Sequence, residues 1–334
     1  MKLNLSSSEG MTERQIRISG RRTTGASIAK LLSVSMMCVI SAMAADAKAG
    51  QSANSGDIVF TDSSATVLRA DIATAKSAVV TTGQKLMQPF GIAVGRNGEY
   101  FVSDTGCLGL LGVNPATGEQ RLIACGGILG IPFGIAVEES GMVLVANGSA
   151  VVRVNPVTGA PSILASGGHL QAPIAVAVAE NGNIFVVEAL GAIVRLDPKT
   201  GSQKLISSGK YLQRPQGIAV SGNFLYVTDV ATSDMNFGVG RIIQINANSG
   251  HQRVLAEAGN LVSPVGITVH PDGDLIVGDP YTMNPGSVDV FDGAIIRVDR
   301  LSGQQTPIAR GSQSFVNPRC VMVVPSAGLN VAAN

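Results

Sequence analysis

The chain repeats a short segment in which a proline precedes a run of small and branched apolar residues. The six copies span residues 89–94, 132–137, 173–178, 215–220, 264–269 and 318–323. Their prolines are 43, 41, 42, 49 and 54 residues apart. Self-similarity at this period is typical of propeller blades or solenoid turns. The pattern therefore predicts a repeat protein.

One repeat, residues 173–209, shows the internal pattern most clearly. Four short β-type runs cover 174–179, 183–187, 192–197 and 203–207. Turn sequences separate them, including Asn181-Gly182 and the segment from Pro198 to Gly201. Each repeat is therefore predicted to be a four-stranded antiparallel meander.

The first run of each repeat places small residues on one face and branched residues on the other. Gly91 and Ala93 alternate with Ile92 and Val94, for example. Wedge-shaped sheets that pack around an axis need this asymmetry, because the bulky face of one sheet must fit the small face of its neighbour. This alternation favours a propeller over an open sheet.

The two ends of the chain complete each other. The sixth repeat has only its first strand, whereas 56–62 and 67–71 resemble the second and third strands of a repeat. The sequence thus predicts an all-β, six-bladed propeller over residues 56–325, in which three N-terminal strands and one C-terminal strand share a blade. Residues 326–334 are expected to form a flexible tail.

Composition agrees with this class and limits the partners. Forty glycines and fifteen prolines suit short strands joined by tight turns, and no long helical pattern occurs. The net charge is +1 and 14% of residues are charged, so the chain has no strong field that would favour nucleic acid. We expect a monomer.

Residues 1–47 have the features of a signal peptide. Arg14, Arg17 and Lys30 precede an apolar stretch over 31–43. The A-x-A segments 42–44 and 45–47 follow, so cleavage is expected near 44–47. An uncleaved anchor is the alternative, and Met11 is a second candidate start. The sequence therefore predicts a secreted protein, periplasmic or extracellular, with a linker over 48–55 and no membrane span after cleavage.

Three cysteines lie outside this segment. Cys107 and Cys125 flank a predicted hairpin, so a disulfide between them is expected in an oxidising compartment. The alternative is two small buried thiols. Cys320 lies within an apolar strand and is expected to be a buried free thiol.

Together, the Pro-x-Gly-Ile-Ala-Val run, the Gly-x-x-x-Val-x-Asp run and the Ile/Val-Arg-Val run with Thr-Gly resemble the NHL-repeat propellers and the wider gluconolactonase-like six-bladed group. That group includes strictosidine-synthase-like proteins and streptogramin lyases, so the resemblance implies a propeller fold with a binding, lactonase or lyase role. Gluconolactonase-like members place metal ligands near the start of the first strands. Here those positions hold Phe90, Phe133, Ile174, Gln216, Val265 and Arg319, which do not form a metal shell.

A polar residue ends the second strand of every predicted blade, and in a propeller these positions gather on one face. The residues are Asp62, Asp104, Asn147, Glu188, Asp229 and Asp279. Carboxylates at Asp104, Glu188, Asp229 and Asp279 are candidate ligands for Ca²⁺ or another divalent cation. The alternative is structural, with each residue capping a turn or pairing with a third-strand arginine. Those arginines are Arg69, Arg153, Arg195, Arg241 and Arg297.

Further candidates are expected on the same face. His169 lies in a loop that leads into a blade, while His251 and His270 fall at turns of the opposite face. The segments 230–240 and 280–292 lengthen the connection after the second strand in two adjacent blades. With Arg214, Tyr281 and Arg319 they form a candidate ligand-binding surface.

These features favour a secreted binding module that holds a small molecule or a protein through its loop face. The alternative is a metal-assisted hydrolase or lyase that uses a cation at the channel mouth. No motif in the sequence specifies a catalytic residue.

Overall fold

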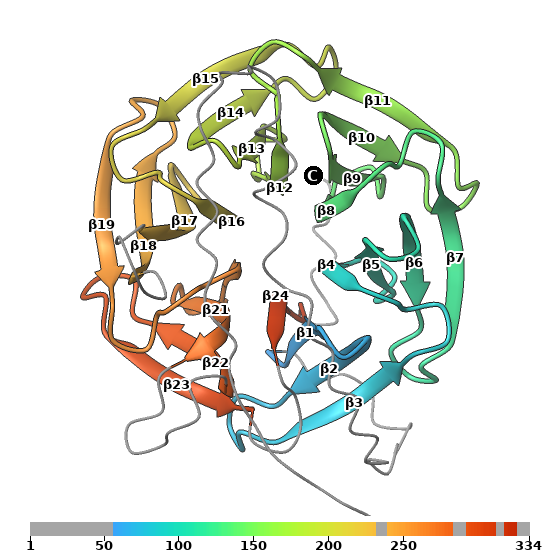
Figure 1. Ribbon diagram of the computed structural model, residues 1–334, viewed down its shortest axis with the longest axis horizontal. Helices are drawn as coiled ribbons and strands as arrows, with labels where there is room; N and C mark the ends of the chain where they lie inside the picture. Colours follow the sequence, from blue (N-terminus) through green and yellow to red (C-terminus); the bar gives the residue numbers. More distant parts are fainter. Residues whose placement is uncertain (1–55, 232–238, 283–291, 312–316, 326–334) are drawn as a thin grey trace, which may run out of the picture. The chain divides into compact units, whose positions relative to one another are not determined.

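The structure is a computed structural model that describes residues 56–231, 239–282, 292–311 and 317–325. These residues form 24 strands in six four-stranded antiparallel sheets. The sheets stand in a ring, with one strand of each near the centre and one at the periphery (Figure 1). The predicted six-bladed propeller is confirmed.

The strands fall into four classes by their position in the blade. The innermost strands are β4 (Pro89–Val94), β8 (Pro132–Val137), β12 (Pro173–Val178), β16 (Pro215–Ser221), β20 (Gly266–Val269) and β24 (Pro318–Val323). The second strands are β1 (Ile58–Asp62), β5 (Tyr100–Asp104), β9 (Val143–Asn147), β13 (Ile184–Glu188), β17 (Phe224–Ala231) and β21 (Leu275–Thr282). The third strands are β2 (Thr66–Ala70), β6 (Gly109–Val113), β10 (Ala150–Val154), β14 (Ala192–Leu196), β18 (Val239–Asn246) and β22 (Asp292–Val298). The outermost strands are β3 (Ser77–Thr82), β7 (Gln120–Cys125), β11 (Pro161–Ser166), β15 (Gln203–Ser208), β19 (Gln252–Glu257) and β23 (Gln305–Arg310).

The shared blade forms as predicted, in the order β24-β1-β2-β3. Strand β24 pairs antiparallel with β1, and Phe60 lies opposite Val321. The Asn317 N–H also donates a hydrogen bond to Asp62 at 2.7 Å. Because pairing covers the edge that β1 would otherwise expose, the ring is closed.

The core lies between neighbouring blades. Ile135 of β8 packs with Ala93 of β4 and with Phe101 of β5, so the branched face of one innermost strand meets the small face of the one before it. Gly266 shows how close this approach is. A Cβ there would lie 2.6 Å from the Arg319 carbonyl oxygen and 2.6 Å from the Cys320 Cα. The alternation in the sequence thus reflects wedge packing.

Glutamines at the start of four outermost strands tie the blades together at the periphery. Each side-chain oxygen accepts an N–H from the loop between two blades, as His169 donates to Gln203 at 2.7 Å and Asn260 to Gln305 at 2.8 Å. Gln120 and Gln252 accept in the same way from Lys85 and Tyr211. These bonds fix the path of the connecting loops.

The predicted signal peptide, the linker and the tail all lie outside the described residues. Their assignment, and secretion with it, stays a prediction. Within the described ranges no helix is long and apolar enough to cross a membrane.

Candidate functional site

The ring of polar residues anchors the loops that lead into the innermost strands. Four of these residues end their second strands as predicted, whereas β17 and β21 continue past Asp229 and Asp279 to Ala231 and Thr282. We call this side of the propeller the ring face. The Asp104 carboxylate accepts N–H donors from Met87 and Gln88, before β4, and from Gly106 and Cys107, after β5. These distances run from 2.7 to 3.0 Å. Asp104 therefore joins two loops of one blade.

The other acidic members follow the same rule. The Asp229 carboxylate accepts from Gln213 and Arg214 at 2.8 and 2.9 Å. Asp279 accepts from Val262 at 2.8 Å and also from the Ser263 and Tyr281 N–H groups. All three carboxylates are buried.

Two members differ chemically. The Asn147 side-chain oxygen accepts from the Ile131 N–H at 3.1 Å, while its amide donates to the Ile128 carbonyl at 2.7 Å. One Glu188 oxygen accepts from Gln171 and Ala172, and the other is buried with no partner among the described residues. Since an amide can replace a carboxylate here, the shared property is hydrogen bonding to the loop rather than charge.

The four predicted metal ligands do not converge in the described part of the chain. No group of three His, Cys, Asp or Glu side chains placed to hold a metal ion occurs there. Oxygens of Asp104, Glu188, Asp229 and Asp279 already accept loop N–H groups. The geometry is that of a scaffold, and divalent-cation binding stays a prediction for solution measurement.

Burial raises the pKa of three ring acids. It raises the pKa of Asp279 to about 7 against the effect of three backbone N–H donors. It also raises the pKa of Glu188 and of Asp229. Desolvation penalises the charged form of each acid. These groups couple the stability of the ring face to pH.

One third-strand arginine, Arg241, pairs with an acid of the ring, Asp229. Arg241 donates to Asp229 at 2.9 Å, and both side chains are buried. Arg69, Arg153 and Arg297 instead pair with Asp57, Glu138 and Asp274. Those acids precede second strands, so they lie on the face opposite the ring.

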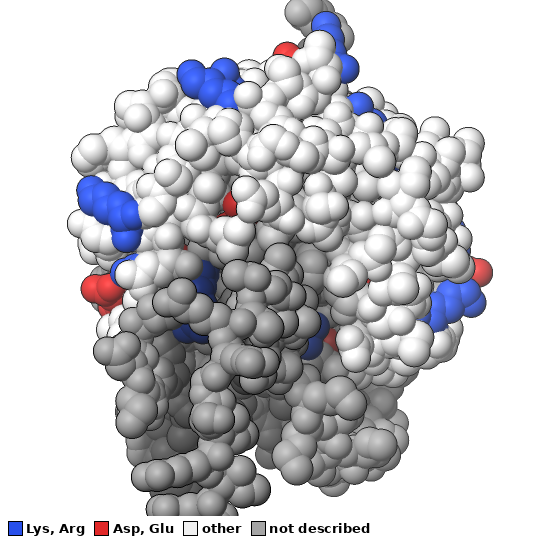
Figure 2. Space-filling view, turned by 45° about the horizontal axis from the view of Figure 1, so that its top comes forward, with Lys and Arg blue, Asp and Glu red and all other residues white. Residues whose placement is uncertain are grey.

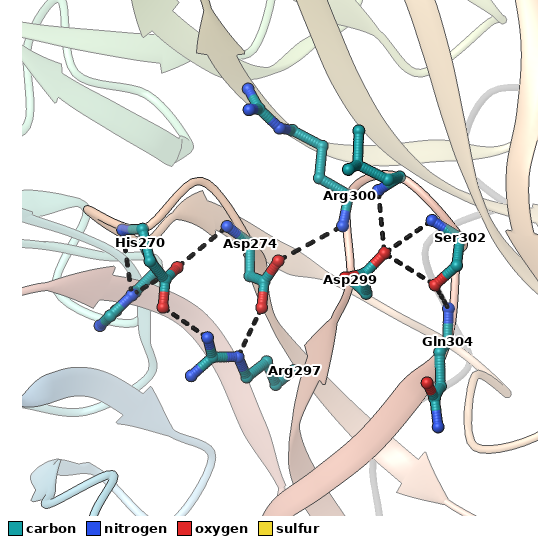
Figure 3. Close-up of polar contacts among 9 residues, drawn as sticks. His270, Asp274, Arg297, Asp299, Arg300, Ser302 and Gln304 are labelled. Atoms are coloured by element: carbon teal, nitrogen blue, oxygen red, sulfur yellow. Dashed lines mark hydrogen bonds and ion pairs between the residues drawn. The ribbon is translucent and has the colours of Figure 1, made fainter.

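That opposite face holds a polar network within one blade (Figure 3). Arg297 donates to Asp274 at 2.7 Å, and His270 Nδ1 lies 2.7 Å from an Asp272 oxygen. Asp299 accepts the Ser302 N–H and hydroxyl in the next turn. The network joins turns that flank β21 and β22, so its evident role is to fix those turns.

The residue after the proline of each repeat lies at the ring-face end of the innermost strands, and we call these six positions the mouth. Four of them, Phe90, Ile174, Gln216 and Val265, line the central cavity. A β-bulge at this point interrupts the pairing of five innermost strands, for example between Pro89 and Ile92. Bulges redirect side chains. The six mouth residues, all partly exposed, are Phe90, Phe133, Ile174, Gln216, Val265 and Arg319.

Hydroxyl groups hold three mouth residues in place. Thr61 donates to the Phe90 carbonyl at 2.6 Å, Ser103 to the Phe133 carbonyl and Thr228 to the Val265 carbonyl at 2.7 Å. Each hydroxyl comes from the blade before the one it contacts. The mouth is thus positioned by contacts between blades.

The mouth leads into an apolar cavity of about 290 Å³ along the ring axis. All six innermost strands line it, from Phe90 and Ile174 at the ring face to Val94 and Val178 at the other end. Thr268, Gln216 and Cys320 are its polar side chains. Its size is near the lower limit of small-molecule sites, which span roughly 300–1,000 Å³.

Arg319 is the charged residue among the six mouth positions. Its guanidinium carbon lies 5.8 Å from the centre of the Phe90 ring, and Phe90 meets Phe133 edge to face at 5.3 Å. Burial lowers the pKa of Arg319, and the nearby Asp62, Tyr281 and Asp104 act in the opposite direction. The mouth therefore combines one cation with an aromatic pair.

The other predicted residues lie apart from this centre. His169 is exposed, and its main chain is held by Gln203 of an outermost strand. Arg214 is exposed beside Asp229, with its Nε 3.4 Å from the Val230 carbonyl oxygen. Tyr281 is partly exposed and near enough to Arg319 to affect its pKa. Most of segments 230–240 and 280–292 lies outside the described residues.

The predicted Cys107–Cys125 disulfide is not formed in this structure, where both cysteines are free thiols. The strand register pairs Cys125 with Gly109 rather than with Cys107. A Cβ on Gly109 would lie 3.2 Å from both the Cys107 Sγ and the Cys125 Cβ. The glycine leaves the space between the two side chains open, so pairing in an oxidising compartment stays a prediction.

Charged groups are sparse on the surface in view. Lys, Arg, Asp and Glu appear singly or in small mixed groups, and uncharged residues cover most of the described surface (Figure 2). The described part of this face therefore has no broad patch of one sign.

No family model and no curated protein matches the chain by sequence. Solved structures do match in three dimensions. A chain from a nidogen–laminin complex aligns with a TM-score of 0.65 at 14% identity, over 81% of this chain and 98% of that one. Virginiamycin B lyase from Staphylococcus aureus aligns with a TM-score of 0.53 at 19% identity, over 72% and 75%. Such likeness establishes the fold, and with the site it defines a six-bladed propeller with an apolar central channel.

Proposed function

We propose that the protein is a secreted, non-catalytic binding propeller that holds a small molecule at the channel mouth. The apolar cavity behind that mouth carries the proposal. A concave apolar site with a few polar groups is the usual form of a small-molecule site. Phe90 and Phe133 supply contact area, while Gln216 and Arg319 supply hydrogen-bond donors.

Binding is favoured over catalysis by what the buried acids do. The ring carboxylates accept N–H groups from the loops, so their hydrogen bonding serves the scaffold. The similarity to a chain from a nidogen–laminin complex supports a binding role, since that chain belongs to a protein complex. A protein partner on the ring face is the second form of this proposal.

Ligand-dependent thermal unfolding tests the proposal. A panel of small anions, cations and uncharged apolar compounds is screened against the wild type and Gln216→Trp. The indole of that variant is larger than the glutamine side chain and narrows the mouth. Leu122→Trp is the matched control, because Leu122 is 47% exposed on the outermost strand β7. We expect at least one compound to stabilise the wild type and Leu122→Trp but not Gln216→Trp. A compound that stabilises all three equally places binding elsewhere.

Metal analysis addresses the alternative, a metal-assisted hydrolase or lyase. We expect the purified protein to contain no stoichiometric divalent cation, because oxygens of the ring acids accept loop N–H groups. Bound Ca²⁺ that disappears in Asp104→Asn, together with lactone hydrolysis, would favour the enzyme instead.

A further inference from the structure

The six mouth positions are equivalent by the repeat, yet one of them differs in charge. Five hold apolar or uncharged side chains, and the sixth holds Arg319 on β24. A structural requirement of the fold would apply to every blade, because each innermost strand meets its neighbour in the same way. The cation at this single position therefore calls for a local explanation.

Arg319 has no ion-pair or hydrogen-bond partner among the described residues. Six other arginines, by contrast, form ion pairs with acids: Arg69, Arg96, Arg121, Arg153, Arg241 and Arg297. The guanidinium carbon of Arg319 instead lies over the Phe90 ring, 5.8 Å from the ring centre. Its charge is thus partly desolvated without a directly bonded counter-charge.

The acids near Arg319 have their oxygens turned to other donors. One Asp62 oxygen accepts from Ser64 and the other from the Asn317 N–H at 2.7 Å. The Asp104 oxygens accept from the N–H groups on both sides of its blade. These carboxylates lower the cost of burying the cation, but each is already bonded to its own loops.

A guanidinium that lies over an aromatic face keeps its N–H edge available. The group carries five N–H donors in a planar fork, which matches the two oxygens of a carboxylate. A cation held over a ring face is also preorganised for such a contact. Arg319 is therefore suited to bind a carboxylate at the rim of the mouth.

The cavity next to this rim suits the rest of such a ligand. Its wall is made by Gly, Ala, Ile and Val residues of the innermost strands, and it is also lined by Phe90, over whose ring Arg319 lies. A volume of about 290 Å³ admits a short aliphatic or single-ring body. Burial of that body is favourable by about 25 cal/mol per Å².

We propose that the channel mouth binds a small organic carboxylate, with its anionic group on Arg319 and its apolar body against Phe90 and within the channel. This inference rests on the proposed function and adds the chemical class of the ligand. Specificity requires both Arg319, which binds the carboxylate, and the apolar channel, which binds the body. The cavity alone does not distinguish an acid from an alcohol.

Isothermal titration of the purified protein with octanoate, octanol and acetate tests the proposal. We expect octanoate to bind more tightly than octanol by about tenfold or more, since charge-assisted hydrogen bonds are worth about 1.5–3 kcal/mol. Acetate, which lacks an apolar body, should bind at least tenfold more weakly than octanoate. Equal affinity for octanoate and octanol, or no binding of octanoate, overturns the proposal.

Variants test whether Arg319 is the residue that binds the carboxylate. Arg319→Gln should weaken octanoate about ten- to hundredfold and leave octanol within about twofold, while Arg319→Lys should recover part of the loss. Arg96→Gln is the control, because Arg96 is an exposed arginine whose pair with Glu139 is also exposed. Thermal unfolding of each variant confirms folding. Octanoate binding that is unchanged in Arg319→Gln overturns the assignment.

The outcomes separate this inference from the function on which it rests. If octanoate and octanol bind equally and Gln216→Trp abolishes both, the channel binds ligands but does not select anions. If no compound of the panel binds in a way that depends on Gln216, the proposed function fails as well.

Discussion

Replacing Gly266 by alanine tests the packing between blades directly. The added Cβ would lie 2.6 Å from the Arg319 carbonyl oxygen, 2.6 Å from the Cys320 Cα and 2.7 Å from the Val321 nitrogen. All three are backbone atoms of β24, which is fixed by its ladder to β1. Ordinary carbon contacts are about 3.5–4.0 Å, so the sheets must separate or the strand must shift.

The expected cost follows from overpacking. Inserting a methyl group into a well-packed core typically costs about 1–3 kcal/mol. Gly130→Ala is the matched control, because Gly130 has no positive φ and no atom within 4 Å of a Cβ. Alanine there should leave stability unchanged or raise it by up to about 1 kcal/mol through the unfolded state.

Equilibrium unfolding in urea, followed by far-UV circular dichroism, measures both variants, since the chain has no tryptophan to report by fluorescence. We expect Gly266→Ala to unfold at a clearly lower urea concentration than the wild type and Gly130→Ala at the same or a higher one. If the two variants have the same midpoint, close approach between blades does not explain the small residues of the innermost strands.

Three further predictions concern buried charges and thiols. Burial raises the pKa of Asp279 from 3.8 to about 7, so the native state binds the proton more tightly than the unfolded state. The melting temperature should therefore fall as pH rises from about 4 to about 7 and level off above that. Asp279→Asn should flatten that fall, and an unchanged slope would assign the pH dependence to other groups. Arg241→Met should lower the free energy of unfolding by about 3–5 kcal/mol, because it leaves a buried carboxylate unpaired. The exposed control Arg96→Met should lower it by less than about 1 kcal/mol in the same urea titration, and similar losses would contradict a special role for burial. Oxidised glutathione, which accepts the two electrons released by Cys107 and Cys125, should reduce by two the number of thiols that react after denaturation. An unchanged count would show that the pair does not close.

Much of the fold could be predicted because its determinants are local and repeated. The turn residues set the strand lengths, and the unfinished sixth repeat required the N-terminal strands as partners, as the pairing of Phe60 with Val321 confirms. The outermost-strand glutamines were overlooked, although Gln120, Gln203, Gln252 and Gln305 recur at the same place in their repeats. That recurrence was the signal that could have identified their contacts with the connecting loops.

The candidate site was less accessible from the sequence. The repeat shows that a polar residue recurs near the end of each second strand, but the partners of these residues are mostly backbone N–H groups, which carry no signature in side-chain identity. The aromatic and cationic mouth depends on a β-bulge, and its contacts, such as Arg319 on Phe90, join residues from opposite ends of the chain. Such a juxtaposition is set by ring closure rather than by any local motif.

Closure by β24 also affects how the protein is made. The Cys320 N–H donates a hydrogen bond to the Thr61 hydroxyl across 259 positions of the chain. Strand β1 therefore cannot complete its pairing until β24 has been synthesised. Contacts this distant in sequence form slowly, and an unpaired strand edge can pair with other chains until then. The interval between synthesis of β1 and arrival of β24 is therefore when a ribosome-bound chain most needs protection from aggregation.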